Sequence, residues 1–148
     1  MVWDWMLQIA CSFVATTGIA ALFNAPRNRL IHCGLVGVVG WVIYYLLIEN
    51  GADEVPATFA GSFVIALVAH LLARLLKMPV IVFSVAGIIP FVPGGMAYEA
   101  MRALVVHEYI EGLEYAVRTA ILTGTIVLGF GAAEVPISFL NRRKKAPS

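Results

Sequence analysis

The chain has 148 residues, of which 61% are hydrophobic and 13% charged, and its formal net charge at pH 7 is +1. A soluble domain carries about a quarter charged residues, so this composition excludes an ordinary soluble domain. The few charges and two cysteines also exclude disordered chains, basic nucleic-acid binders and disulfide-rich scaffolds. Because a membrane-spanning helix needs about 20 mostly apolar residues, the length predicts an all-α, polytopic membrane helix bundle forming a single transmembrane domain over residues 1–148.

Four apolar segments are long and regular enough to cross a bilayer. No Lys or Arg precedes the first of them, which therefore lacks the basic start of a cleavable signal peptide, and we expect it to be retained. A polar link with Pro26 follows the first segment, and an acidic turn at 49–54 follows the second. The last segment precedes a basic tail at 141–148. These four spans are predicted at residues 2–23, 30–48, 56–76 and 117–140.

A further span is predicted at 79–98, but it cannot be one smooth helix. The stretch 78–98 is apolar and holds three prolines and three glycines, and proline both removes a backbone donor and clashes with the preceding turn. It either crosses as a broken helix or dips in and returns on the same side. The positive-inside rule, by which short basic loops stay cytoplasmic, chooses between the two.

The basic residues favour the crossing. If the loop at 24–29 is cytoplasmic and 79–98 crosses, the basic tail is cytoplasmic too, and eight of the ten Lys and Arg lie on one side. A returning loop would send the tail outside. The sequence therefore predicts five transmembrane helices with a broken fourth helix, the amino terminus outside and the carboxyl terminus inside.

Residues 99–115 are predicted to form an outer interfacial helix or the outer end of the fourth span, because their apolar side chains recur at roughly helical spacing. Two pairs on this stretch, Glu99 with Arg102 and Glu114 with Arg118, are spaced to meet on one helix face.

The most informative segment is 90–95, which contains Pro90, Pro93, Gly94 and Gly95. Several backbone groups lose their helical partners there, and a membrane tolerates this only in a protein interior or beside water. The break begins about 11 residues after Pro79, or roughly 16 Å along a helix, which is near the midplane. Such discontinuous helices point to the substrate site of a transporter. The alternative is a structural kink packed by its neighbours.

Glu134 is an acidic residue inside the apolar last span, and helical spacing places it on one stripe with Thr119 and Thr123. Intramembrane carboxylates are costly and by default functional, so this stripe is a candidate polar path. Alternatively, Glu134 lies close enough to the cytoplasmic surface to snorkel or pair with the basic tail.

His70, Arg74 and Lys77 share one face of the third span, with His70 deepest. They are candidates to attract carboxylates or relay protons, and ordinary snorkelling toward lipid headgroups is the alternative. Asn24 lies at the mouth of the first span. No catalytic or metal-binding motif occurs in the sequence, so we expect no enzyme activity, metal or cofactor.

The chain resembles the threonine/serine exporter family, specifically short chains similar to the carboxyl-terminal membrane half of that family. The resemblance rests on FNAPR at 23–27, GLVG at 34–37 with Trp41, and IIPFVPGG at 88–95 followed by Tyr98. It implies a small subunit that works in a bacterial cytoplasmic (inner) membrane with a larger homologous subunit carrying a cytoplasmic domain. The implied substrates are small polar metabolites: threonine and serine, or dicarboxylates such as succinate.

On this interpretation, substrate binds at the subunit interface near the break, where Tyr98 and Thr123 offer hydroxyls. Arg27, Arg74 and His70 would draw in a carboxylate, and Asn24 would line the mouth. Protonation of His70 or Glu134 is the candidate coupling step. The expected partners are the larger subunit, membrane lipid and a small-molecule substrate, with no nucleic acid. Two alternatives stay open: a scaffold subunit that does not itself transport, and a homo-oligomeric small-solute channel.

Overall fold

The computed structural model describes residues 2–144, with side chains from 3 to 138, and it contains helices and turns but no strand over that range. The predicted all-α membrane bundle is confirmed. The helices are α1 (Val2–Leu22), η1 (Arg27–Arg29), α2 (Leu30–Glu49), α3 (Glu54–Leu76), α4 (Val80–Ile88), η2 (Ile89–Phe91), α5 (Gly94–Val105) and α6 (Tyr109–Lys144).

Within the described residues, four helices are long and apolar enough to cross a membrane, and a bent pair makes a fifth crossing if it counts as one span. That pair joins Val80–Phe91 to Gly94–Val105 at an angle of 51°. The predicted break in the fourth span is therefore present. A bend of 51° is far from the reversal that a returning loop requires, so α5 carries the chain onward from the end of α4.

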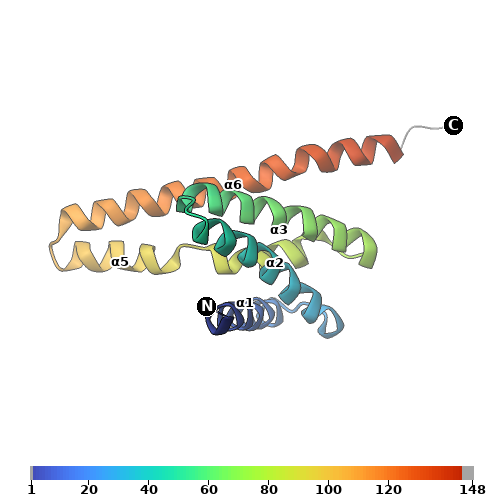
Figure 1. Cartoon of the computed structure of the whole chain (residues 1–148), viewed down its shortest axis with the longest axis horizontal. Helices are drawn as coiled ribbons and strands as arrows, with labels where there is room; N and C mark the ends of the chain where they lie inside the picture. The colour runs from blue at the N-terminus through green and yellow to red at the C-terminus, as the bar shows by residue number, and fades with distance from the viewer. Residues whose placement is uncertain (1, 145–148) are drawn as a thin grey trace.

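The segment 99–115, predicted as an interfacial helix or as the end of the fourth span, is divided between two helices: 99–105 belongs to α5 and so to the fourth span, whereas 109–115 begins α6. Helix α5 ends at Val105 and α6 begins at Tyr109, so the segment folds as an antiparallel hairpin in which Gly112 packs on Leu104. Helix α6 has 36 residues, or roughly 54 Å of length, and it extends the predicted last span at its start. Figure 1 shows the hairpin reaching beyond the other helices at one end of the molecule.

Four helices end in the same way, with one residue in the left-handed conformation. After α1, for example, the amide of Ala25 donates to the Ala20 carbonyl at 2.9 Å and the amide of Asn24 donates to Ala21 at 3.1 Å. This Schellman arrangement satisfies the last carbonyls of a helix. The residues with positive φ are Asn24, Gly51, Lys77 and His107. Three of the four are not glycine, and His107 is one of them, so the turn at His107 carries no sequence signal. This is why the sequence did not predict that the helix ends at Val105.

Small residues allow the helices to pack closely. Gly34 and Gly37 on α2 leave no room for a side chain beside Phe13 and Thr16 of α1. Helices α3 and α6 run parallel, because Ser62 packs against Gly129 and Ala66 clusters with Ala133 one turn further on. These contacts bury the small-residue face that membrane helices use for association.

Candidate functional site

The break between α4 and α5 follows from its two prolines. Pro90 lies in the short helix η2 and Pro93 precedes α5, so neither donates a backbone hydrogen bond. The amide of Val92 donates to Ile89 at 3.2 Å and that of Gly94 to Val92 at 2.7 Å. These short-range bonds replace the regular helical ladder and let the chain change direction.

The Phe91 side chain fixes the break in the bundle. It is 7% exposed, and its ring makes edge contacts with Trp41 and Tyr44 of α2 at centroid distances of 5.9 and 5.6 Å. The ring lies against Gly61 of α3, where an added Cβ would come within 2.5 Å of it. A glycine at this position is therefore needed to seat the ring.

This packing places the break nearer one end of the bundle than the predicted midplane. Gly61 is roughly 10 Å from Glu54 at the start of α3 and roughly 22 Å from Leu76 at its end. At the end of α3 the amide of Met78 donates to the Ala73 carbonyl at 2.9 Å, and the chain folds back along α3.

A small pocket of about 170 Å³ lies beside the break. Its walls combine an aromatic side with polar groups from the start of α3, namely the carboxylate of Glu54 and the hydroxyl of Thr58. We call it the inner pocket. The residues that line it are Trp41, Tyr44, Glu54, Thr58, Pro90, Phe91, Val92, Pro93, Met96 and Leu122.

A second pocket of about 190 Å³ adjoins the opposite side of Pro90 and Trp41 and is lined otherwise by α1. The indole of Trp41 donates to the side-chain oxygen of Gln8 at 3.0 Å. Ser12 is buried at this pocket, and its hydroxyl has no hydrogen-bond partner within the described part of the chain. Polar side chains therefore reach the break on both sides, Glu54 and Thr58 on one side and Gln8 and Ser12 on the other.

An ion pair joins the start of α3 to α6 next to the inner pocket. Arg118 donates from Nη2 to Glu54 Oε2 at 2.6 Å and from Nε to the same oxygen at 3.1 Å. Arg118 thus bonds to Glu54 and not, as the spacing predicted, to Glu114. The other predicted pair is confirmed, with Arg102 Nε 2.7 Å from Glu99 Oε2.

Of the predicted substrate residues, Pro90 and Pro93 line the inner pocket. Gly94 and Gly95 are exposed, with open space beside them, and Tyr98 is 66% exposed. These three residues therefore lie on the surface of the bundle, where a substrate site would need a second protein surface to complete it.

Thr123 is also exposed, and its hydroxyl donates to the Thr119 carbonyl at 2.8 Å. The neighbouring Leu122, rather than Thr123, reaches the inner pocket. The sequence analysis did not single out Glu54, Thr58 or Arg118 as site residues. The sequence did hold a signal for the Glu54–Arg118 pair. Opposite charges lie at the starts of two predicted spans, and both spans enter the membrane from the same side.

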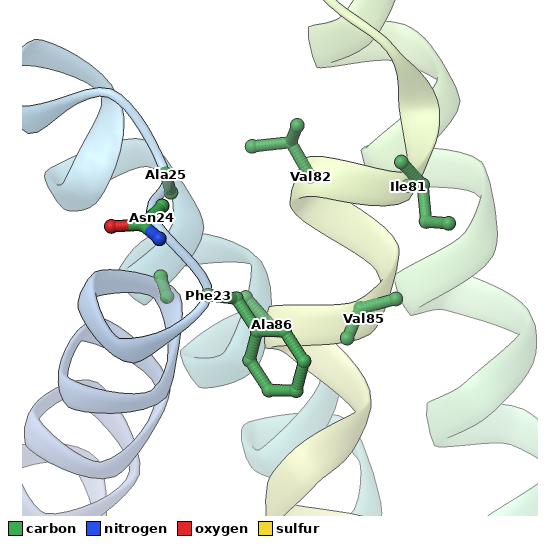
Figure 2. Close-up of a pocket in the computed structure, with 8 residues that line it drawn as sticks. Phe23, Asn24, Ala25, Ile81, Val82, Val85 and Ala86 are labelled. Atoms are coloured by element: carbon green, nitrogen blue, oxygen red, sulfur yellow. The ribbon is translucent and has the colours of Figure 1, made fainter.

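Asn24 and Arg27 lie at the other end of the bundle from the break. Asn24 borders an apolar cavity of about 280 Å³ between the end of α1 and α4, together with Phe23, Val82 and Ala86. In Figure 2 the Asn24 amide points away from Val82, while the chain turns sharply at Asn24. The structural role of Asn24 is thus to end α1. Arg27 is exposed in η1.

His70 is half-buried on α3, and its Nδ1 lies 2.9 Å from the Ala66 carbonyl, which requires the proton on Nδ1. Arg74 is exposed one turn further along. Glu134 is exposed on α6, next to Ala133, which packs on Ala66. Of the three candidates for coupling, two lie one turn apart on α3 and the third lies on α6.

Comparison with known proteins agrees with this architecture. Residues 8–135 match the family described as "Threonine/Serine exporter, ThrE". The chain belongs to the threonine/serine exporter family. It is a membrane protein of a transporter family, and transport across the membrane is the activity of that family. A protein of Haemophilus influenzae, described only as uncharacterized, is 33% identical over 125 residues, covering 78% of this chain and 42% of its own length. The chain therefore spans less than half of that relative. No solved structure matches the chain.

Proposed function

We propose that this chain is the small membrane subunit of a two-component exporter of small polar metabolites. The observation that carries the proposal is the broken helix inside a bundle of membrane-spanning helices, with a partly polar pocket on one side and the side chains of Gln8 and Ser12 on the other. Irregular backbone at membrane depth is tolerated where it lines a cavity, and transporters bind substrates at such breaks. Membership of the exporter family supports the same conclusion.

The inner pocket favours a small substrate. Its volume of about 170 Å³ is below the roughly 300–1,000 Å³ of drug-sized ligand sites. Hydroxyl-bearing side chains and one carboxylate line it, so a solute of few heavy atoms with polar groups, such as serine or threonine, fits both its size and its chemistry.

The larger subunit would cover the exposed face of α6. Glu134 follows Ala133, which packs beside Ala66 of α3. Ala66 is roughly 18 Å from the start of α3 and roughly 15 Å from its end. Glu134 is therefore exposed near the middle of the bundle, where a carboxylate facing bare lipid costs several kcal/mol. A polar partner surface removes this cost.

The proposed orientation places the amino terminus outside. The basic residues Arg27, Arg29, Arg74 and Lys77 lie at the end of the bundle where α1 and α3 finish, and acidic residues gather at the opposite end. The positive-inside rule then assigns the basic end to the cytoplasm, which in a bacterium makes this a multi-pass protein of the inner membrane. The inner pocket and the α5–α6 hairpin face outward on this assignment.

An efflux assay tests the proposal. Proteoliposomes holding the chain with a co-expressed larger family member from the same genome are loaded with radiolabelled serine, threonine or succinate. We expect release of serine or threonine only when both subunits are present. Equal release with the larger subunit alone would contradict transport by this chain and favour the scaffold, and release by this chain alone would favour the homo-oligomeric channel.

A further inference from the structure

The Glu54–Arg118 ion pair stands between two cavities. On its inner side is the inner pocket, and on its outer side is a groove of about 490 Å³ between the starts of α3 and α6, which we call the outer groove. Glu54 and Leu122 line both cavities, and Arg118 lines the outer groove. A solute that passes from the break to the outside by this route must pass the ion pair.

The ion pair is built so that it can open. The Arg118 side chain is 58% exposed and that of Glu54 is 24% exposed, and ion pairs with such access to solvent contribute little to stability. Nε and Nη2 of Arg118 both donate to the same oxygen, Oε2 of Glu54, so the two hydrogen bonds of the pair share one acceptor atom.

We propose that Glu54 and Arg118 form the outer gate of the export path and select amino-acid zwitterions. This inference rests on the proposed function. A zwitterion exchanges partners with the closed gate: its ammonium binds the Glu54 carboxylate, and its carboxylate binds the Arg118 guanidinium in the planar, two-bonded manner that guanidinium favours. One ion pair becomes two, and the net charge at the gate does not change.

A dicarboxylate cannot make this exchange. Glu54 is the charged residue among those lining the inner pocket, and the outer groove adds Glu114 and Arg118. Two carboxylates therefore face one guanidinium along this route, and a dianion meets like charge as soon as it leaves Arg118. Like charges at close range repel each other, so the gate disfavours succinate relative to serine.

Competition against labelled serine in the two-subunit proteoliposomes tests the gate. The competitors are ethanolamine, which is serine without its carboxylate, 3-hydroxypropionate, which is serine without its ammonium, and succinate. The variants are Glu54→Gln and Arg118→Gln. The matched controls are Glu99→Gln and Arg102→Gln, which remove the charges of an exposed ion pair that borders neither cavity.

Unlabelled serine should compete at least about tenfold better than each analogue in the unaltered protein, since a hydrogen bond to a charged group commonly has at least this effect. Arg118→Gln should remove most of the advantage over ethanolamine. Glu54→Gln should remove most of the advantage over 3-hydroxypropionate and succinate. The control variants should leave all three ratios unchanged.

The preference ratios separate recognition from a structural role. If the gate variants lower serine transport but keep the ratios of the controls, the ion pair only holds α3 to α6 and the inference is overturned. If the unaltered two-subunit protein exports none of serine, threonine and succinate, the proposed function itself fails, whereas export of succinate in preference to serine overturns only the gate. Binding provides an independent reading: with Trp3→Phe and Trp5→Phe, the fluorescence of Trp41 at the inner pocket should respond to serine, and Arg118→Gln should weaken that response at least about tenfold.

Discussion

Gly61→Ala should destabilise the bundle by overpacking the break. The new Cβ would lie 2.5 and 2.7 Å from two carbons of the Phe91 ring, whereas carbon atoms in ordinary contact are about 3.5–4.0 Å apart. The ring must therefore retreat by about 1 Å, but Trp41 and Tyr44 hold it from the α2 side. Overpacking of this kind costs about 1–3 kcal/mol.

The measurement is the free energy of unfolding by denaturant titration in mixed micelles, followed by tryptophan fluorescence. Gly18→Ala is the matched control, because nothing lies within 4 Å of the position of its added methyl group. Phe91→Leu removes the ring atoms that Gly61→Ala would strike, so the double variant should be more stable than the sum of the single effects by about 1 kcal/mol or more. Simple additivity within about 0.5 kcal/mol would refute the assigned position of the ring.

Three further predictions concern residues singled out by the sequence. Because Asn24 has a φ of 57°, Asn24→Gly should keep the free energy of unfolding within a few tenths of a kcal/mol, whereas Asn24→Ala should lower it by about 1 kcal/mol. Equal stability of the two variants would contradict the helix-ending role. Normal efflux by Asn24→Gly would exclude a binding role for the amide. Pro93→Ala should lower serine efflux severalfold while membrane insertion, measured by protease protection, stays intact; unchanged efflux would mean that the break is only structural. Glu134→Leu should weaken co-purification with the larger subunit, since it replaces a polar contact, while Val135→Leu at the next exposed position should not, because it keeps an apolar side chain. A stronger association of Glu134→Leu would mean that Glu134 faces lipid.

The secondary structure was predictable because the membrane imposes strong rules. Backbone groups in hydrocarbon must be paired, so long apolar segments can only be helices, and the prolines at 90 and 93 could only interrupt one. The helix starts and ends of α1 to α3 fall within two residues of the predicted bounds. The turn at His107 escaped prediction because it contains neither Gly nor Pro and is stabilised by backbone hydrogen bonds to Ala103 and Leu104.

The sequence by itself determined the membrane class, the broken fourth span and the family, because these depend on composition, local backbone chemistry and short motifs. Only the tertiary structure decided which side chains meet at the break. Glu54 and Arg118 are 64 positions apart, and the parallel packing of α3 on α6 alone brings them together. Tyr98 and Thr123 carry suitable hydroxyl groups but point outward, because the rotation of a helix about its axis is set by the partners it packs against and not by its own composition.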